Sequence, residues 1–435
     1  MSADFSLATS QIHGGGAVPE GDQLTAVVPI YQSAAYRFDD TQHAQDIFSL
    51  QRKGNLYSRT ANPTSLSFER RVAALEGGVM GIATASGQSA VFIALAALVR
   101  SGDHIVASSS LYGGTLDLLL DLLPDFGIET TLVDQDDPDA WRAAVRPETR
   151  VFFAETLSNP AGKVLDIETI AEIAHSVDAP LVVDSTLASP ALLRPLDFGA
   201  DIVVHSATKI LGGHGSALGG VIVDGGRFDF GRVPDRWPQF TEPYARYGDL
   251  VLWDEFGPAG GAYGILLRTK YLHDLGPSPA PFSSFLILQG IETLDLRVGR
   301  QNASALELAT WLAKHPAVAS VNYAGLPESP QHDLALKYVP RGAGSVFSFD
   351  VVGGEDAARR LIDSLRLFTL AANIGDARSL VIHTATTTHS HLDDASLAAA
   401  GASRATVRLS IGLENPADLI ADLEQGLAQL TKDAS

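Results

Sequence analysis

Between residues 104 and 224 the sequence alternates between short runs of apolar, often β-branched residues and longer segments with a helical pattern. The runs are HIVAS at 104–108, ETTLV at 129–133, RVFFAE at 150–155, PLVVD at 180–184, DIVVHS at 201–206 and GVIVD at 220–224. Continuous apolar strands that alternate with helices are typical of a mostly parallel sheet covered by helices on both faces. We therefore predict an α/β fold built around such a sheet.

The regions on either side of these runs indicate further parts of the molecule. Residues 1–60 are polar and broken by glycine and proline, so we expect an irregular arm that lies on a larger body. Residues 225–282 lose the strand rhythm, which suggests a loop insertion with a functional role. A long helical pattern over 285–312 leads into a mixed α+β part. We expect an arm over 1–60, a large domain over 61–290 that contains the insertion, and a small C-terminal domain over 291–435.

The charge and the cysteine content exclude several functional classes. The 435 residues include 31 Lys and Arg against 51 Asp and Glu, a formal net charge of −20. Such a chain repels phosphate backbones and anionic membrane surfaces, so we expect neither nucleic acid nor membrane as a partner. The chain has no cysteine, which excludes disulfides, thiolate nucleophiles and cysteine-based zinc sites. No secretory signal and no bilayer-spanning run is evident, so we expect a cytoplasmic protein.

Polar residues follow three of the predicted strands at the point where each strand ends. Asn159 follows RVFFAE, Asp184 ends PLVVD, and Lys209 follows DIVV within HSATK. Ligands of open parallel sheets bind beyond the carboxyl ends of the strands. A lysine in a partly desolvated pocket has a lowered amine pKa and can form Schiff bases, whereas a solvated surface lysine is the alternative. Asp184 could keep a pyridine nitrogen protonated or could simply cap the next helix.

Two segments near Lys209 have the character of an anion site. Ser206 and Thr208 precede the lysine and a glycine-dense loop follows it, so both hydroxyls could donate to a phosphate. Ser86, Gly87 and Gln88 open an apolar helix, and the backbone N–H groups at such a start favour an anion. An ordinary N-cap role for Ser86 is the alternative.

Three further positions have a functional and a structural interpretation. Tyr112 follows HIVAS at the same sheet edge and could stack on a planar cofactor and exchange protons, or belong to the core. Arg408 could hold a carboxylate through two parallel hydrogen bonds, or form a surface ion pair. His383, His389 and His391 lack carboxylate or cysteine ligands at suitable spacing, so we predict no metal site.

Nine motifs spread over nearly the whole chain carry a family resemblance. They are YSRTANPT at 57–64, TASGQSA at 84–90, YGGT at 112–115, ETLSNP at 155–160, VVDST at 182–186, HSATK at 205–209, GGHGSALGGVIVDGG at 212–226, NIGDARSLVIH at 373–383 and RLSIGLE at 408–414. Together they resemble the pyridoxal-phosphate (PLP) enzymes of cysteine and methionine metabolism, and most closely the O-acetylhomoserine sulfhydrylases. GGHGSALGG after the lysine is similar to the sulfhydrylases, and Gly114 stands where methionine lyases have cysteine.

The resemblance implies a fold-type I PLP-dependent transferase, with a large, mostly parallel seven-stranded sheet domain and a smaller C-terminal α+β domain. It implies that Lys209 forms the Schiff base with PLP and shuttles protons, while Asp184 pairs with the ring nitrogen. The other implied cofactor residues are Ser86, Gly87, Gln88, Ser206 and Thr208 around the phosphate, Tyr112 and Asn159 at the ring, and Tyr57 and Arg59 from the neighbouring subunit. Arg408, Ser379 and Asn159 would bind the substrate, and the active unit would be a homodimer at least, often a tetramer.

The implied reaction is a γ-replacement in methionine biosynthesis that converts O-acetyl-L-homoserine and sulfide to L-homocysteine and acetate. Cystathionine γ-synthase, cystathionine γ-lyase and methionine γ-lyase activities are the alternatives, and a non-catalytic binding protein is a more distant one. HTATTTH departs from the sulfhydrylase pattern H-P-A-S-T-T-H at Thr384 and Thr386, where we expect an effect on substrate preference. The preferred acyl ester and the choice between sulfide and methanethiol stay open.

Overall fold

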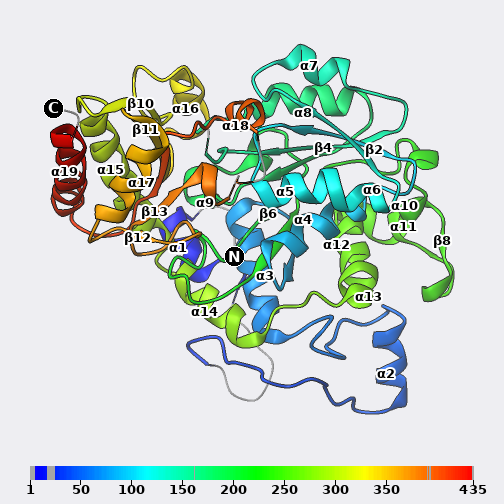
Figure 1. Cartoon of the computed structure of the whole chain (residues 1–435). Helices are drawn as coiled ribbons and strands as arrows, with labels where there is room; N and C mark the ends of the chain where they lie inside the picture. Colours follow the sequence, from blue (N-terminus) through cyan, green and yellow to red (C-terminus); the bar gives the residue numbers. More distant parts are fainter. Residues whose placement is uncertain (1–4, 17–24, 161, 389, 391–392, 434–435) are drawn as a thin grey trace.

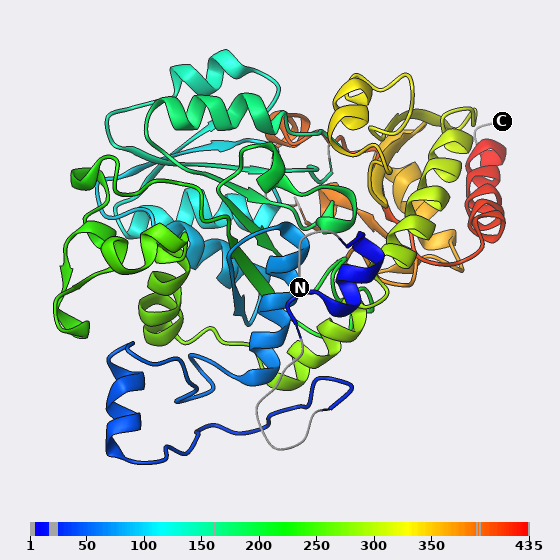
Figure 2. The ribbon, with the colours of Figure 1, turned by 180° about the vertical axis from the view of Figure 1, so that it is seen from behind.

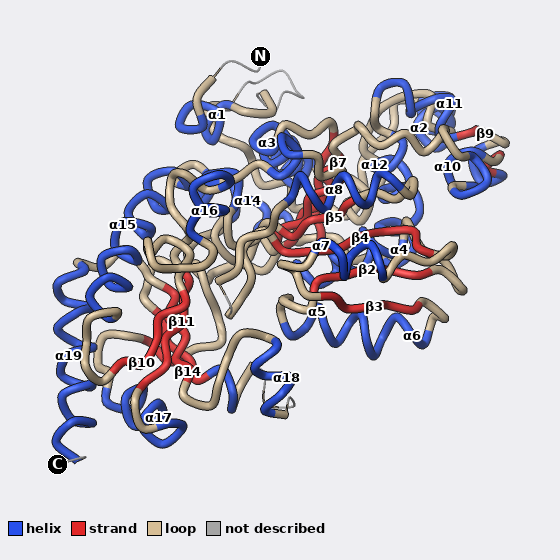
Figure 3. The backbone as a smooth tube through the Cα atoms, turned by 90° about the horizontal axis from the view of Figure 1, so that it is seen from above, coloured by secondary structure: helices blue, strands red, loops and turns tan. Residues whose placement is uncertain are grey.

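The structure, a computed structural model, describes residues 5–16, 25–160, 162–388, 390 and 393–433. It contains two β-sheet bodies side by side, one formed by the middle of the chain and one by its C-terminal part (Figure 1). The view from above separates the strands β2, β3, β4, β5 and β7 of the first body from β10, β11 and β14 of the second (Figure 3). In the part of the chain that is described, no helix is long and apolar enough to cross a membrane.

The larger sheet has seven strands in the order β1-β7-β6-β5-β4-β2-β3. The strands are β1 Met80–Thr84, β2 His104–Ser108, β3 Glu129–Val133, β4 Thr149–Glu155, β5 Leu181–Asp184, β6 Ile202–His205 and β7 Gly220–Asp224. Strands β2 to β6 are parallel, and β7 runs antiparallel to both β6 and β1. The predicted α/β fold with a mostly parallel seven-stranded sheet is confirmed. Because β1 runs in the direction of β6, the carboxyl ends of β1, β4, β5 and β6 share one edge.

Helices cover both faces of this sheet, as the alternating pattern predicts. They are α3 Pro63–Glu76, α4 Gly87–Ala96, α5 Gly113–Asp117, η1 Leu118–Leu122, α6 Leu123–Asp125, α7 Pro138–Ala143, α8 Ile167–Ser176, α9 Ser189–Leu192 and η2 Pro195–Phe198. Apolar residues of α3, α8 and α9 pack in one core cluster with Val183 and Val203, whereas α4, α5 and α6 pack in a second cluster with Val182 and Val204. Neighbouring strand residues point to opposite faces, which explains why a continuous apolar strand serves both clusters.

The smaller sheet has five strands in the order β10-β11-β14-β13-β12. They are β10 Val318–Asn322, β11 Val346–Val351, β12 Thr369–Leu370, β13 Leu380–His383 and β14 Thr406–Ser410, and the accompanying helices are α16 His332–Tyr338, α17 Gly354–Ser364, α18 Asp394–Ala399 and α19 Pro416–Asp433. All neighbouring strands are antiparallel except β12 and β13, which are parallel. The C-terminal part is α+β as predicted, while the domain boundaries at residues 60 and 290 remain predictions.

Two segments are more regular than the sequence suggests. The arm over 1–60 contains α1 Leu7–His13, which packs on α3, and α2 Thr41–Phe48, which lies at the periphery of the molecule (Figures 1 and 2). The insertion over 225–282 is not an irregular loop. It contains η3 Pro234–Arg236, α10 Pro238–Thr241, β8 Pro243–Tyr244, η4 Ala245–Tyr247, β9 Leu250–Val251, α11 Leu252–Phe256, η5 Gly257–Ala259, α12 Ala262–Leu266, η6 Leu267–Leu272 and α13 His273–Leu275. Several of its aromatic side chains, Tyr263 among them, belong to the second core cluster, so this segment is packed into the body of the protein.

The long helical pattern over 285–312 forms two helices instead of one. Helix α14 spans Pro281–Ile291 and α15 spans Leu294–Leu312. The break follows Gly290, whose carbonyl oxygen accepts hydrogen bonds from the Thr293 N–H and from the Arg297 guanidinium. Apolar periodicity continues through the break, which is why it does not reveal it.

Candidate active site

A cavity of about 910 Å³ opens at the carboxyl edge of the large sheet, where the small sheet approaches it. Ten of the predicted site residues line it: Ser86, Gly87, Gln88, Tyr112, Asn159, Asp184, Ser206, Thr208, Lys209 and Arg408. They come from loops after β1, β2, β4, β5 and β6, and from β14. Strand ends of a parallel sheet therefore converge here as the general rule predicts.

Lys209 lies in a tight turn after β6 and directs its amine into the cavity. The Lys209 N–H donates to the Ser206 carbonyl at 3.1 Å, and the Gly213 N–H donates to the Lys209 carbonyl at 2.7 Å. The Lys209 Nζ donates to Oδ1 of Asn373 at 2.5 Å. Burial, and secondarily the positive charge of Arg408, lowers the pKa of the Lys209 amine. An amine with a lowered pKa is available as a nucleophile and as a base.

Two buried carboxyl groups lie side by side at the ends of neighbouring strands. Glu155 on β4 is in register with Asp184 on β5. Burial raises the pKa of Asp184. Burial, reinforced by the nearby Asp184 charge, raises the pKa of Glu155 well above its ordinary value. A cation placed against Asp184 would stabilise its charged form, so the cavity offers a strong partner for a protonated ring nitrogen.

The start of α4 lines the same cavity as these two carboxyl groups. The Ser86 side chain accepts a hydrogen bond from the Ser89 N–H at 3.1 Å and is therefore the N-cap. The first N–H groups of a helix, those of Gly87 and Gln88 here, have no acceptor within the helix. A Cβ at Gly87 would collide with the Ser206 side chain, so only glycine allows this close approach. The N-cap interpretation of Ser86 is confirmed, and its anion-binding role stays a prediction that is compatible with it, since a capped helix start also favours an anion.

Tyr112 lies at the mouth of the cavity with about half of its surface exposed, so it is not a core tyrosine. Its N–H donates to Oε1 of Glu155 at 2.6 Å. The neighbouring turn is held by Gln88, whose Nε2 donates to the Gly114 carbonyl at 2.5 Å. The Tyr112 backbone is therefore fixed beside Glu155, and the exposed part of its ring is accessible to a planar molecule.

Arg408 reaches the cavity from β14 of the small sheet and is buried, so it is not a surface ion pair. One terminal nitrogen lies 3.5 Å from Oδ1 of Asn159, and the other donates to the Asn373 carbonyl at 3.3 Å. Its Nε has no hydrogen-bond partner within the described residues. Burial lowers the pKa of Arg408 to about 10, so it stays charged at neutral pH. A buried guanidinium with spare donors is suited to a carboxylate ligand.

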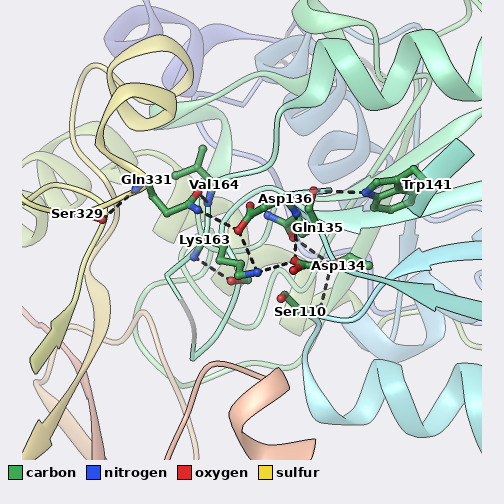
Figure 4. A network of polar contacts seen from close by, with 11 residues as sticks. Ser110, Asp134, Gln135, Asp136, Trp141, Lys163, Val164, Ser329 and Gln331 are labelled. Atoms are coloured by element: carbon green, nitrogen blue, oxygen red, sulfur yellow. Dashed lines mark hydrogen bonds and ion pairs between the residues drawn. The ribbon is translucent and has the colours of Figure 1, made fainter. Parts of the chain in front are cut away.

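The loop that carries Asn159 is held by a polar network (Figure 4). The Lys163 ammonium lies 2.8 Å from Asp134 and 3.0 Å from Asp136, and the Lys163 N–H donates to the Ser158 hydroxyl at 3.0 Å. Gln331, which belongs to the C-terminal part, donates to Asp136 and accepts from the Val164 N–H. The network therefore joins the Asn159 loop to both parts of the molecule.

Three predicted site residues do not line the cavity. Ser379 is buried, and its hydroxyl donates to Glu414 at 2.8 Å. Arg59 donates to the His273 carbonyl and lies over the ring of Tyr57, at 5.5 Å from its centroid. The structure therefore gives no support within one chain to the predicted ligand role of Ser379, and it places Tyr57 and Arg59 outside their own cavity.

The HTATTTH segment adjoins the site through Thr388, which lines the cavity. His383, the last residue of β13, contacts Thr386 of the following short turn η7, Thr384–Thr386, at 2.8 Å. Thr384 is buried, and its hydroxyl has no partner within the described residues. His389 and His391 lie outside the described residues.

Asn373 and Glu155 are site residues that the sequence analysis does not single out. Both fall inside motifs that the resemblance uses, NIGDARSLVIH and ETLSNP, which is the one signal that could have pointed to them. The site thus combines an amine with a lowered pKa, a buried carboxyl group, a helix start and a buried guanidinium with spare donors. Such a set can bind a phosphorylated, positively charged ring and an amino-acid carboxylate at the same time.

Comparison with known proteins agrees with this chemistry. Residues 8–428 match the family model described as Cys/Met metabolism PLP-dependent enzyme. The O-acetyl-L-homoserine sulfhydrylase of Leptospira meyeri is 48% identical over 99% of this chain and 98% of its own length, and that of Corynebacterium glutamicum is 46% identical over 98% of each. A Campylobacter jejuni crystal structure assigned as O-acetylhomoserine (thiol)-lyase, which contains a pyridoxyl-lysine monophosphate, has a TM-score of 0.94 at 41% identity, over 98% of this chain and 100% of that one.

Proposed function

The chain belongs to the Cys/Met metabolism PLP-dependent enzymes, and on this premise we propose that it acts as an O-acetylhomoserine sulfhydrylase. It replaces the acetate group of O-acetyl-L-homoserine with sulfide and releases L-homocysteine, a transferase reaction of methionine biosynthesis. The observation that carries the proposal is the convergence of Lys209, Asp184 and Arg408 on one cavity in a chain that is 48% identical to such an enzyme over its full length.

The residues present fit the cofactor of the family. Lys209 supplies the buried amine for a Schiff base, and Asp184 supplies a carboxylate that a ring cation would stabilise in its charged form. The N–H groups at the start of α4 and the Ser206 hydroxyl would provide donors for the phosphate. The Thr208 hydroxyl, which donates to the Gly219 carbonyl in this structure, would join them by turning toward the phosphate. Bound PLP supplies an electron sink for negative charge at the substrate carbon next to the amine.

The protein's own residues then handle binding and protons. Arg408 holds the substrate carboxylate through its spare donors, and Asn159 helps to orient the substrate beside it. The Lys209 amine takes the proton from the α carbon, since its lowered pKa favours the neutral base. It gives this proton up again within the site and, neutral once more, takes a proton from the β carbon. The Tyr112 ring covers the site and its phenol exchanges protons with the leaving group. Acetate leaves from the γ carbon, and sulfide adds there.

The other predicted residues, Tyr57, Arg59 and Ser379, do not line the cavity of their own chain. Tyr57 and Arg59 lie outside their own cavity, which supports a role at the phosphate of a neighbouring subunit in a homodimer or homotetramer. Ser379 contributes to substrate binding only indirectly, because its hydroxyl donates to Glu414 instead of facing the cavity. A cytoplasmic location follows the expectation from the sequence and is tested by cell fractionation.

The decisive experiment gives purified protein O-acetylhomoserine and sulfide and measures homocysteine and acetate. Homocysteine formation that Lys209→Ala abolishes supports the proposal, and Lys314→Ala, which changes an exposed lysine, is the matched control. The absence of homocysteine, together with conversion of cystathionine or methionine to an oxo acid, would assign the chain to the lyases instead. Parallel assays with acetyl, succinyl and phospho esters, and with methanethiol in place of sulfide, define the preference.

A further inference from the structure

Arg297 on α15 is a buried cation that bonds backbone carbonyl groups instead of a carboxylate. Its guanidinium donates to the carbonyls of Ile210 at 3.0 Å, Leu211 at 3.2 Å and Gly290 at 2.7 Å. No carboxylate pairs with it within the described residues, and burial lowers the pKa of Arg297 to about 10. A buried charge without an opposite charge is costly and persists where its hydrogen bonds are needed.

The carbonyl groups that Arg297 holds belong to the turn of the catalytic lysine. Ile210 and Leu211 directly follow Lys209, and the turn closes at Gly213. Gly213 has a positive φ of 68°, and a Cβ there would collide with the Arg297 guanidinium. The guanidinium therefore fills the space beneath the turn and fixes the direction from which the Lys209 side chain leaves it.

Gln301, one helical turn after Arg297, holds the loop that faces Lys209. Its Nε2 donates to the Asp376 carbonyl at 2.9 Å, three residues after Asn373. The side chains of residues four apart lie on the same face of a helix. One face of α15 therefore holds both the Lys209 turn and the Asn373 loop.

The two held segments are also in direct backbone contact. Gly375 has a positive φ of 71°, and a Cβ there would lie 2.8 Å from the Ile210 nitrogen and 3.1 Å from the Lys209 carbonyl carbon. The Lys209 amine and the Asn373 amide meet across this contact at 2.5 Å. A shift of either segment would thus change the hydrogen bond that orients the catalytic amine.

We propose that Arg297 and Gln301 are positioning residues that set the geometry between the Lys209 amine and Asn373. They act through the carbonyls of Ile210, Leu211 and Asp376 and touch neither substrate nor cofactor. The assignment deepens the proposed function, since it concerns the amine that carries the protons. Their loss should lower kcat much more than it raises KM, because the chemical step depends on the orientation of the amine.

The test compares Arg297→Met, Arg297→Lys and Gln301→Met with the control Arg300→Met. Arg300 lies on the same helix, is exposed, and donates to the Glu414 carbonyl. Each PLP-loaded variant is characterised by kcat, KM, thermal unfolding and the pH titration of its visible absorption. We expect Arg297→Met and Gln301→Met to lower kcat about tenfold or more with KM within about twofold, and to shift the pH midpoint of the absorption. Arg297→Lys should recover part of kcat, and Arg300→Met should match the wild type.

Folded variants with wild-type kcat and wild-type absorption titration would overturn the proposal. A loss of kcat that merely follows a lowered unfolding temperature, with an unchanged titration midpoint, would also overturn it. If Arg297→Met does not fold, Gln301→Met decides by the same criteria, since it removes one donor and no charge. If the wild type makes no homocysteine, the proposed function fails, and the absorption titration still tests the positioning of Lys209.

Discussion

At the residue scale, the missing side chain of Gly114 leaves room for the ring of Tyr112. A Cβ at position 114 would lie 2.7 Å from Cε1 of that ring, closer than real carbon contacts allow, and 3.2 Å from Cζ, which is a tight contact. Tyr112 is half exposed, so its ring can rotate away at little cost to the fold. The glycine therefore matters for where the ring lies over the cavity and hardly for stability.

We expect Gly114→Ala to lower kcat/KM about tenfold or more, because the displaced ring no longer covers the reacting groups. The thermal unfolding temperature should change little. The control is a double-mutant cycle with Tyr112→Ala, in which Gly114→Ala should add nothing once the ring is gone. Equal effects of Gly114→Ala in both backgrounds would show that it acts elsewhere.

The same scale limits what the sequence can predict about the site. Lys209, Asp184 and Arg408 could be found because their chemistry is evident from residue type, and the first two stand at strand ends. Asn373 and Arg297 could not, since their roles come from partners 164 and 87 residues away. An amide or a guanidinium gains such a role only when the fold brings a specific amine or carbonyl against it.

At the element scale, apolar runs predict strands and helices well where each element makes its own pattern. Strand β1, Met80–Thr84, is missed because its Gly81 and Ala83 have low strand propensity, and pairing with β7 stabilises it instead. The break between α14 and α15 is missed because apolar periodicity continues through it, while the hydrogen bond from Arg297 to the Gly290 carbonyl spans it. In both cases the element bounds depend on contacts between residues apart in the sequence, and the hydrophobic pattern along the sequence does not contain these contacts.

The glycines of α14 and α15 provide a stability test with opposite expected signs. A Cβ at Gly299, on the exposed side of α15, would meet nothing within 4 Å, so Gly299→Ala should stabilise by about 0.5–1 kcal/mol through the lower entropy of the unfolded chain. A Cβ at Gly290 would collide with the Gly212 carbonyl, so Gly290→Ala should destabilise by about 1–3 kcal/mol. Thermal unfolding measures both. A lowered unfolding temperature of Gly299→Ala would contradict this packing. An unfolding temperature of Gly290→Ala that is not lowered would contradict it as well.

At the scale of the whole molecule, an acidic chain of net charge −20 brings a guanidinium and a lysine amine from separate parts of the chain to one cavity. Lys209 and Arg408 face the cavity from the two sheets, which explains why the site needs both parts of the chain. Tyr57 and Arg59, in contrast, stand at the end of the N-terminal arm over 1–60 and do not line the cavity of their own chain. The arm is therefore the segment that would carry these residues to a second subunit.

Subunit mixing tests this arrangement. If Arg59 serves the cavity of a neighbouring subunit, a hybrid of a Lys209→Ala chain and an Arg59→Ala chain contains one complete site, formed by Lys209 of the second chain and Arg59 of the first. Random reassembly of the two weakly active or inactive variants as dimers should then restore about a quarter of the wild-type activity. The control mixes Lys209→Ala with Asp184→Asn, two residues that line the same cavity of one chain. Each hybrid site then lacks one of the two residues, so this mixture should regain no activity. No gain with Arg59→Ala, measured after unfolding and joint refolding, would place Arg59 in its own subunit's function.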